Sequence, residues 1–369
     1  MLHGSRDWRA YSTGANRKTM NSFLPGRQVR IIPPEGPHDA EIAIVGEAGG
    51  AVEDQQLRPF VGPAGGVLEQ CLHTAGLIRS EVWLTNVIKL RPAGNDIRPY
   101  FNGKTFSAEG YEWVEQLRAE LDELNPNVIV ACGKTAMAAL TGDTRITTLR
   151  GYVMPSIGMK KERKVIPMIH PAASLYDKKG GDKGSLATKE FKPYLYRYVI
   201  ALDLEKAKAE SSSPELVRPQ RKLAYEFDSV EEVLEWCNYF ERQERVCLDI
   251  EVTNFELACI GFSSDPLVAC SIPLDEQWSE EDEMRIYRGL QRVLGNPNSV
   301  KVGHNLPFDI QFLLTRCGIE VRGPIEDTMM AHSILYPELP KSLAFLGSVY
   351  CGSQAFWKGL RFENIKENS

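Results

Sequence analysis

The chain has 369 residues, of which 43% are hydrophobic and 25% are charged, and its formal net charge is −6. This composition is typical of an ordinary globular protein, and the length favours two domains. The negative charge excludes an overall basic surface, which disfavours a protein that coats nucleic acid without specificity, but it is compatible with a nuclease whose metal site is acidic.

The cysteines and apolar runs bear on the cellular compartment. The 8 cysteines are scattered, mostly within apolar runs, and no Cys-x-x-Cys pair occurs, which indicates free thiols in a reducing compartment. No apolar run reaches the length of a membrane span, and the polar first twenty residues lack the apolar segment of a secretory signal. We therefore expect a cytoplasmic protein that does not associate with membranes.

The first half of the chain alternates expected strands with expected helices. Strands are predicted at residues 41–45, 81–85, 128–131 and 165–169, and helices at 65–75, 113–124 and 135–140. This alternation is typical of an α/β fold with a mostly parallel sheet. The loops after the strands of such a sheet converge on one crevice, which is the usual ligand site.

A change in composition separates the two halves. Residues 205–222 are polar, with two prolines and a serine run, and predict an interdomain linker that could begin as the end of a helix. Beyond it, helices are predicted at 229–239, 279–294 and 307–315, and strands at 245–252, 257–262, 267–272 and 300–303. The expected parts are therefore a polar tail (1–35), a first domain (36–204), the linker (205–222) and a second domain (223–369).

Two carboxylates share one face of the strand expected at 245–252. Successive strand side chains point to opposite faces, so Asp249 and Glu251 lie on one face and the apolar residues lie on the other. Such a pair is costly to desolvate unless cations neutralise it, and a solvated strand face is the plain alternative. Asp309 follows at a strand-to-helix turn, and three converging carboxylates could hold Mg²⁺ or Mn²⁺.

Three motifs in the second half occur in a characteristic order. They are Leu-Asp-Ile-Glu at 248–251, Val-Gly-His-Asn-Leu-Pro-Phe-Asp at 302–309, and Glu-Asp-Thr-Met-Met-Ala-His at 326–332. Together they resemble the proofreading 3′–5′ exonuclease of DNA polymerase I-type enzymes. The resemblance implies a ribonuclease-H-like domain of mixed sheet and helices, in which Asp249, Glu251 and Asp309 are catalytic metal ligands and Asn305 contributes to substrate binding.

The third motif of that family is not found. It carries Tyr-x-x-x-Asp with a fourth metal-binding aspartate, and no such pattern follows Ala331. We therefore expect a domain that is incomplete at its C-terminus, binds metal weakly and degrades DNA poorly by itself. Asp327 is expected to be a helix cap rather than a metal ligand.

The loops of the first half carry residues suited to an extruded nucleobase. Gly46 and Glu47 follow the first expected strand, Asn86 the second and His170 the last, while Phe60 lies between them. Glycine lets a backbone approach a ligand closely, an aromatic ring stacks on a base, and an amide can pair with both N3–H and O4 of uracil. A histidine can stabilise a departing uracil, and a carboxylate can orient water. Taken singly, each residue also has a plain structural explanation.

In this order the blocks resemble the family 4 uracil-DNA glycosylases. The resemblance implies a three-layer α/β domain in which Glu47 and His170 are catalytic and Gly46, Phe60 and Asn86 bind the base. A lysine-rich run at 178–192 is expected to be either a solvated loop or a contact to phosphate.

Two departures from this family stand out. Its members hold an iron–sulfur cluster on four cysteines, one of which stands where this chain has Leu90, and this domain contains only Cys71 and Cys132, so no cluster is expected. Gly49 replaces the proline of the family's Gly-Glu-Ala-Pro-Gly turn. We expect this replacement to loosen the turn that aims Glu47.

The two resemblances predict a DNA replication and repair protein, namely the N-terminal part of a DNA polymerase I-type enzyme, in an arrangement found in some large bacteriophages. Its expected partners are a single-stranded 3′ end, uracil-containing DNA, and a polymerase domain or separate polymerase, in a bacterial or phage-infected cytoplasm. Two alternatives stay open: an active uracil-DNA glycosylase in base excision repair, and a catalytically silent DNA-binding module for a separate polymerase.

Overall fold

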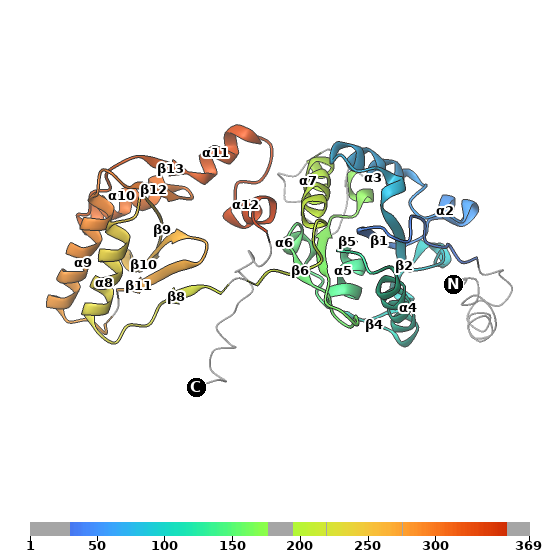
Figure 1. Cartoon of the computed structure of the whole chain (residues 1–369), viewed down its shortest axis with the longest axis horizontal. Coiled ribbons are helices and arrows are strands. Elements are labelled where there is room, and N and C mark those ends of the chain that lie inside the picture. The colour runs from blue at the N-terminus through green and yellow to red at the C-terminus, as the bar shows by residue number, and fades with distance from the viewer. Residues whose placement is uncertain (1–29, 176–194, 219, 275, 353–369) are drawn as a thin grey trace, which may run out of the picture. The chain divides into compact units, whose positions relative to one another are not determined.

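The computed structural model describes residues 30–175, 195–218, 220–274 and 276–352, which divide into two compact units (Figure 1). Unit 1 comprises residues 1–217 together with 347–369, and unit 2 comprises residues 218–346. Most of the expected tail at 1–35 and all of the lysine-rich run at 178–192 lie outside the described residues.

Unit 1 is built on a five-stranded sheet with the order β2–β1–β5–β7–β6. The parallel strands are β1 (Ile42–Ala48), β2 (Trp83–Ile88), β5 (Val128–Cys132) and β7 (Lys164–Met168), and β6 (Met154–Pro155) is antiparallel to β7. Because β1 has β2 on one side and β5 on the other, the strand order reverses at β1. The carboxyl ends of β1 and β5 therefore flank the place where open α/β sheets bind ligands.

Helices cover both faces of this sheet. In Figure 1, α4 (Ala108–Leu124) and α5 (Gly133–Thr141) lie on one side, and α3 (Pro63–Thr74) and α7 (Leu195–Glu210) pack together on the other. The unit therefore has three layers, as predicted. Shorter elements complete it: α2 (Ala51–Gln56), η2 (Arg79–Glu81), η3 (Ala93–Asn95), η4 (Arg98–Tyr100), β3 (Phe101–Asn102), β4 (Thr105–Phe106), α6 (Ile146–Leu149) and η5 (Pro171–Ser174).

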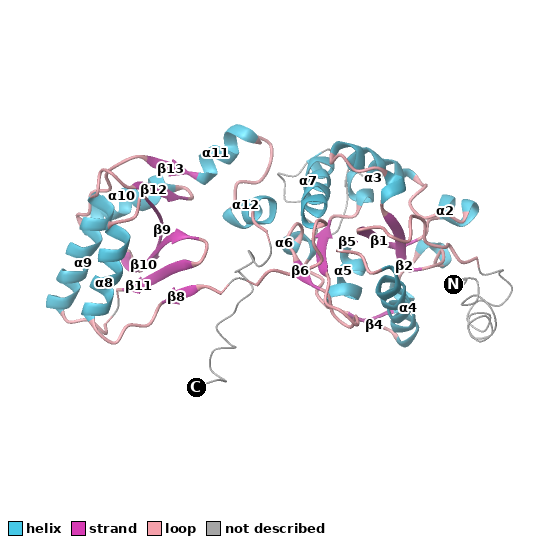
Figure 2. Ribbon diagram, viewed as in Figure 1, coloured by secondary structure: helices cyan, strands magenta, loops and turns pink. Residues whose placement is uncertain are grey.

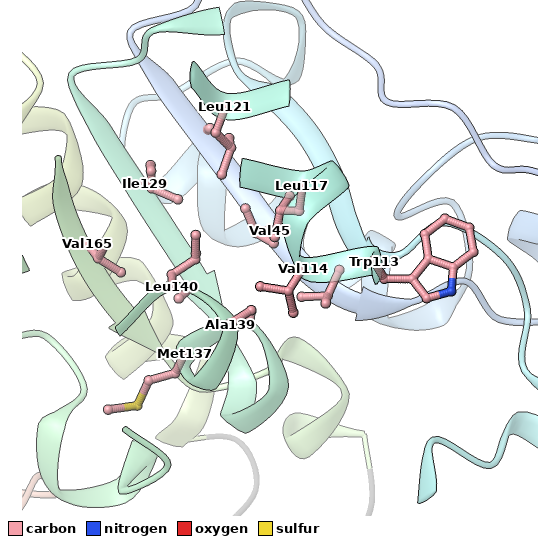
Figure 3. Packing of buried hydrophobic residues seen from close by; sticks show 14 of the residues in the cluster. Val45, Trp113, Val114, Leu117, Leu121, Ile129, Met137, Ala139, Leu140 and Val165 are labelled. Atoms are coloured by element: carbon pink, nitrogen blue, oxygen red, sulfur yellow. The ribbon is translucent and has the colours of Figure 1, made fainter. Parts of the chain in front are cut away.

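The face of the sheet under α4 and α5 is the apolar core seen in Figure 3. Alternate residues of the strands point to this face, and they meet side chains spaced three or four apart along α4. The members labelled in Figure 3 are Val45, Trp113, Val114, Leu117, Leu121, Ile129, Met137, Ala139, Leu140 and Val165. Complete burial of each Val or Leu contributes about 1.5–3 kcal/mol, so this core fixes the strands on which the site depends.

Unit 2 contains a six-stranded mixed sheet with the order β13–β12–β9–β10–β11–β8. Its strands are β8 (Lys222–Ala224), β9 (Arg245–Thr253), β10 (Glu256–Asp265), β11 (Val268–Pro273), β12 (Val300–Gly303) and β13 (Ile325–Asp327). β9, β10 and β11 form an antiparallel meander, whereas β12 is parallel to both β9 and β13. This mixed topology is the one expected of a ribonuclease-H-like domain.

The helices of unit 2 are coloured cyan in Figure 2. They are α8 (Val230–Glu241), α9 (Glu280–Gly295), α10 (Leu306–Cys317), α11 (Thr328–Leu335) and α12 (Leu343–Tyr350), the last of which ends among the residues grouped with unit 1. α8 and α9 pack against each other, and Ser279 caps α9 by accepting a hydrogen bond from the amide of Asp282, as predicted.

Several element boundaries differ from those expected. The first strand continues to Ala48, and the second begins only at Trp83 because residues 79–81 form the turn η2. α7 continues to Glu210, within the stretch predicted as a linker, because Leu204 and Ala207 are buried in the core. Among the described residues, no helix combines the length and apolar character needed to cross a membrane.

Candidate functional site

The end of β1 brings three of the predicted base-binding residues together. A carbon added to Gly46 would lie 2.3 Å from Oδ1 of Asn86 and 2.7 Å from Cζ of Phe60, so the amide and the ring both rest against its bare Cα. Gly46 also pairs with Asn86 in the parallel register of β1 and β2. Asn86 and Phe60 are each only 6% exposed, so the three residues form one closed corner of the unit.

Phe60 is held in an unusual backbone conformation. Its φ is +52°, in the left-handed region that an aromatic residue adopts at a cost of about 1–3 kcal/mol. Arg79 donates hydrogen bonds to the carbonyl oxygens of Phe60 (3.0 Å) and Pro59 (2.7 Å), and Glu35 accepts from Arg79 in turn. Gly65 completes the support, because any side chain there would meet the Phe60 carbonyl at 2.0 Å.

Glu53 organises the same loop, although the sequence did not single it out as a site residue. One carboxylate oxygen accepts from the amides of Val61 (3.2 Å) and Gly62 (2.7 Å), and the other accepts from the amide of Gly50 (3.1 Å). The available signal was its position three residues after Gly50 at the start of α2, the spacing at which a glutamate reaches back to the helix N-terminus.

Glu47 and His170 also lie at this end of the sheet. Thr135, in the first turn of α5, donates its hydroxyl hydrogen to Glu47. Gly133, with φ +86°, admits His170, because an added carbon would lie 3.1 Å from the histidine Cβ. The Gly-Lys-Thr segment at 133–135 thus supports the two predicted catalytic side chains rather than forming a phosphate-binding loop.

The hydrogen bonding of His170 defines its tautomer. The amide of Ala172 donates to Nδ1 of the imidazole over 3.2 Å, so the proton of the neutral ring resides on Nε2. Burial lowers the pKa of His170, although the carboxylates of Glu47 and Glu53 oppose the shift. The ring is therefore neutral at pH 7, with an N–H at Nε2 able to donate to an oxygen that gains negative charge.

The turn after Glu47 is packed at Gly49, the residue that replaces the family's proline. Gly49 is buried, and a carbon added to it would lie 2.0 Å from Cδ1 of Ile32. Ile32 is 2% exposed and its amide donates to the Lys89 carbonyl at 2.7 Å, so it is itself fixed. An isoleucine side chain thus fills the space beside the turn.

The residues of unit 1 do not fit an iron–sulfur cluster. Leu90 is 5% exposed and belongs to the same apolar cluster as Tyr100 and Phe106. A carbon added to Gly110 of α4 would meet the Tyr100 carbonyl at 2.1 Å, so the helix packs directly on this loop. Apolar packing therefore occupies the surroundings of the position at which the glycosylase family has a cysteine ligand.

The two cysteines of the expected glycosylase domain serve as core residues. Cys71 donates from its thiol to the carbonyl of Arg197 in α7 (3.5 Å), and Cys132 is fully buried at the end of β5. Burial raises the pKa of Cys71 to about 11. A buried thiol whose proton is retained at neutral pH is a poor metal ligand.

In unit 2, Asp249 and Glu251 lie on the exposed face of β9, as the alternation predicted. Asp309, in the first turn of α10, is 6% exposed, and its Oδ1 accepts a hydrogen bond from the Ile250 amide at 3.2 Å. Burial and the neighbouring Glu251 raise the pKa of Asp249. Burial raises the pKa of Asp309 to about 6, with the Ile250 amide opposing and Asp249 adding to the shift. Asp249 is thus coupled electrostatically to Glu251, and Asp309 to Asp249.

The donor chemistry of these carboxylates fits a divalent cation, because hard oxygen ligands and a local excess of negative charge are what Mg²⁺ and Mn²⁺ require. Over the described ranges, however, no three His, Cys, Asp or Glu side chains stand close enough to share a metal ion. The predicted convergence of all three into one ligand set is thus not reached.

Asn305 begins α10 with an exposed side chain. Its φ is +68°, and its amide group makes no capping hydrogen bond to the helix. Asp327 accepts hydrogen bonds from the amides of Met329 and Met330 and therefore caps α11, as predicted. Asn305 lies two residues after the end of β12 and four residues before Asp309, and its side-chain amide is exposed.

Phe255 is a candidate that sequence reasoning missed. It is 78% exposed, and with Asn254 it forms the two-residue turn between β9 and β10. Both residues have positive φ, +53° for Asn254 and +66° for Phe255. Such turns strongly favour Asn-Gly, so an aromatic residue at the glycine position was the available signal. Backbone strain at an exposed aromatic residue marks a candidate contact for a ligand.

Two protein families match separate parts of the chain. Residues 33–196 match the uracil DNA glycosylase superfamily, and residues 226–367 match the 3′-5′ exonuclease family. Type-4 uracil-DNA glycosylase of Archaeoglobus fulgidus is 37% identical over 43% of this chain and 75% of its own length. The type-4 uracil-DNA glycosylase of Thermotoga maritima is 33% identical over 49% of this chain and 83% of its own length.

A longer match links the two halves. DNA polymerase of Bacillus phage SP01 is 25% identical over 88% of this chain, which spans 35% of that polymerase. The fold and the family matches define a uracil-DNA-glycosylase-like domain followed by a 3′–5′ exonuclease domain. The chain belongs to the type-4 uracil-DNA glycosylase family through its first half, and its second half is a 3′–5′ exonuclease domain, of a family that generally uses divalent metals. Over most of its length it is a homologue of a phage DNA polymerase. Both predicted resemblances and the fold class are confirmed.

Proposed function

We propose that this chain processes DNA at two chemically separate sites. Unit 2 removes nucleotides from a single-stranded 3′ end with Mg²⁺ or Mn²⁺ bound by Asp249, Glu251 and Asp309. Unit 1 binds a uracil base extruded from DNA. The whole would serve a polymerase, either as a further part of the same polypeptide or as a separate protein. The single observation that carries the nuclease proposal is the hydrogen bond from the Ile250 amide to Oδ1 of Asp309, because Ile250 stands between Asp249 and Glu251 in β9.

In the proposed nuclease site, Asp309 and Asn305 have different roles. The carboxylate of Asp309 is anchored by the Ile250 amide, which fixes it beside the strand that carries Asp249 and Glu251. The exposed amide of Asn305 is placed to contact the terminal nucleotide. A bound divalent cation would activate water and stabilise the charge on the departing 3′ oxygen.

For the base pocket, shape supports the proposal. The ring of Phe60 offers a stacking face, and the amide of Asn86 offers both a donor and an acceptor for uracil N3–H and O4. Both side chains rest on Gly46, so their separation is set by the backbone rather than by flexible side-chain packing. A preformed pocket loses little entropy when the base enters.

Uracil excision is the second candidate function, and the tautomer of His170 favours it. With Nδ1 occupied by the Ala172 amide, the Nε2–H can donate to uracil O2 as the N-glycosidic bond breaks and the base leaves as an anion. Glu47, held by Thr135, is placed to orient the water that adds to the sugar carbon. As the water oxygen bonds to the sugar carbon, Glu47 takes up one water proton. The released uracil anion then gains a proton from solvent, to which Glu47 returns its own, so the reaction is balanced.

Two oligonucleotide assays test the proposal. Release of nucleotides from a 3′-labelled single strand with Mn²⁺ reports the nuclease, and alkaline cleavage of a uracil-containing strand reports excision. Asp249→Ala should remove only the first signal and Asn86→Ala only the second. A protein that binds DNA yet is silent in both assays would instead support the alternative of a DNA-binding module.

A further inference from the structure

One side chain, Asp327, serves the starts of two helices in unit 2. Its Oδ1 accepts hydrogen bonds from the amides of Met329 (2.8 Å) and Met330 (3.1 Å) in α11, and also from the amide of Asn305 (3.2 Å). Its Oδ2 accepts from the amide of Leu306 (2.8 Å), the first residue of α10. Four backbone donors from two helix N-termini thus converge on a single carboxylate.

Because Asp327 caps α10, the side chain of Asn305 does not have to do so. The residue before a helix usually satisfies the orphan amides of the first turn with its own side chain. Asn305 makes no such bond, and its side chain is exposed. Asp327 reaches across from the end of β13 to do so instead, and the left-handed backbone of Asn305 (φ +68°) is held by the same carboxylate.

The carboxylate is itself fixed in place. Gly303 pairs with Asp327 in the parallel register of β12 and β13, and the hydroxyl of Thr328 donates to the Gly303 carbonyl at 2.9 Å. Nδ1 of His304 lies 3.0 Å from the same hydroxyl oxygen. Burial opposes ionisation of Asp327, but the backbone amides outweigh it and hold its pKa below the usual range. The carboxylate of Asp327 is therefore ionised and is hydrogen-bonded to the turn that leads to Asp309.

We propose that Asp327 is a positioning residue of the nuclease site. By capping α10 and α11 with one carboxylate, it orients the first turn of α10, and with it Asp309, against β9. At the same time it leaves the side-chain amide of Asn305 available to the substrate strand. This inference rests on the proposed nuclease function, and it assigns to Asp327 neither metal binding nor contact with the reacting atoms.

Substitution by asparagine separates the two caps. The oxygen of Asn at position 327 can keep the three bonds now made by Oδ1, so α11 stays capped, because Asn is itself a good N-cap. Its NH₂ group, however, cannot accept from the amide of Leu306. Asp327→Asn should therefore loosen α10 alone, whereas Asp327→Ala should loosen both helices. Ser279→Ala is the matched control, since it removes the cap of α9 in the same unit.

The experiment measures kcat and KM on a 3′-labelled single strand, the Mn²⁺ concentration for half-maximal rate, and the melting temperature, for the full chain and the three variants. Asp327→Asn should melt close to the wild type, yet need about tenfold more Mn²⁺ and show a kcat about tenfold lower, as is usual when a group that orients a metal ligand is lost. Asp327→Ala should in addition raise KM, through Asn305. Ser279→Ala should change only the melting temperature.

The outcomes are distinguishable. A wild type without nuclease activity would overturn the proposed function, whereas an active wild type matched by Asp327→Asn in kcat and Mn²⁺ requirement would overturn this inference alone. An equal loss of kcat in Ser279→Ala would show that the effect is merely one of stability. Amide hydrogen exchange tests whether Asp327 caps both helices, and it does not require nuclease activity. The Leu306 amide should exchange at least about tenfold faster in Asp327→Asn, and an unchanged rate contradicts the proposal.

Discussion

The proposed base pocket of unit 1 and the carboxylate face of unit 2 differ in how they are built: the first is formed by packed, uncharged side chains and the second by neighbouring carboxylates. In unit 1, Phe60 and Asn86 both lie against Gly46, and the half-buried Arg79 binds the Phe60 carbonyl, so the protein alone forms the proposed recognition surface. In unit 2, Asp249 and Asp309 carry pKa values raised by burial and by neighbouring carboxylates, so the face concentrates unfavourable charge. A site for a neutral base can be built by packing, whereas a site for cations brings together carboxylates whose charge is unfavourable until a cation or a proton neutralises it.

The largest effect should come from removing one of the repelling groups. Asp249→Ala is expected to lower the rate of 3′ nucleotide release by about a thousandfold or more, because a ligand of a catalytic cation is lost. Excision of uracil should be unchanged in the same preparation. Parallel loss of both activities, measured on labelled oligonucleotides, would contradict the separation of the two sites.

The corresponding change in the pocket is Asn86→Ala. It should reduce uracil excision by about a hundredfold, because the base loses its paired donor and acceptor, and it should leave the nuclease untouched. Asn125→Ala, which alters the C-cap of α4 in the same unit, is the control for general loss of folding. A pocket that excises uracil normally without the Asn86 amide would refute its assigned role.

The next prediction concerns Leu90, which stands where the glycosylase family has a cysteine ligand of its iron–sulfur cluster. Leu90→Ala should lower the free energy of unfolding of unit 1 by about 3 kcal/mol, the cost of a cavity in a closed apolar cluster. Iron chelators should not alter the melting temperature of the wild type, and purified protein should contain no stoichiometric iron. Thermal melts with and without chelator, together with metal analysis, check both statements.

A smaller effect is expected at the tip of the β9–β10 hairpin. Phe255→Ala should weaken binding of a single strand by about tenfold, since stacking of a base on an aromatic ring contributes about 1–3 kcal/mol. Phe255→Gly should bind as weakly as the alanine variant yet melt higher than it, because glycine accepts a positive φ without strain. Fluorescence anisotropy with a labelled oligonucleotide measures the binding, and unchanged affinity would exclude Phe255 from the DNA contact.

The unfavourable charge itself should be visible as a dependence of stability on pH. Because the pKa of Asp309 is raised to about 6 from 3.8, the stabilisation of its protonated form is complete below pH 4 and is lost as pH rises through 6. With chelator present, Asp309→Asn should therefore melt a few degrees above the wild type at pH 8 and show little difference at pH 4. Glu235→Gln on the exposed surface of α8 should show no such dependence. A lower melting temperature of Asp309→Asn at pH 8 would contradict the stated repulsion.

Much of this architecture was predictable because the hydrophobic pattern is strong. Alternation along β9 placed Asp249 and Glu251 correctly on the exposed face, and Ser279 marked the start of α9. The chain order of short motifs was enough to predict the two families. These features are local, so a single sequence contains them.

What the sequence could not supply are contacts between distant segments. Arg79 supports Phe60, and Thr135 holds Glu47, through hydrogen bonds that no spacing along the chain announces. Nor could the sequence predict that Ile32 fills the space beside Gly49, or that Asp327 caps two helices rather than one. Such contacts depend on tertiary packing, which determines the partners that each side chain binds.

One measurement tests the contrast most directly: a single oligonucleotide carrying an internal uracil and a 3′ label, incubated with the full chain in Mn²⁺ and then in excess EDTA. We expect the chelator to abolish release of the labelled nucleotide and to leave the yield of uracil excision unchanged. Nucleotide release that persists in EDTA, or excision that disappears with it, would contradict a cation-dependent site in unit 2 beside a cation-independent pocket in unit 1.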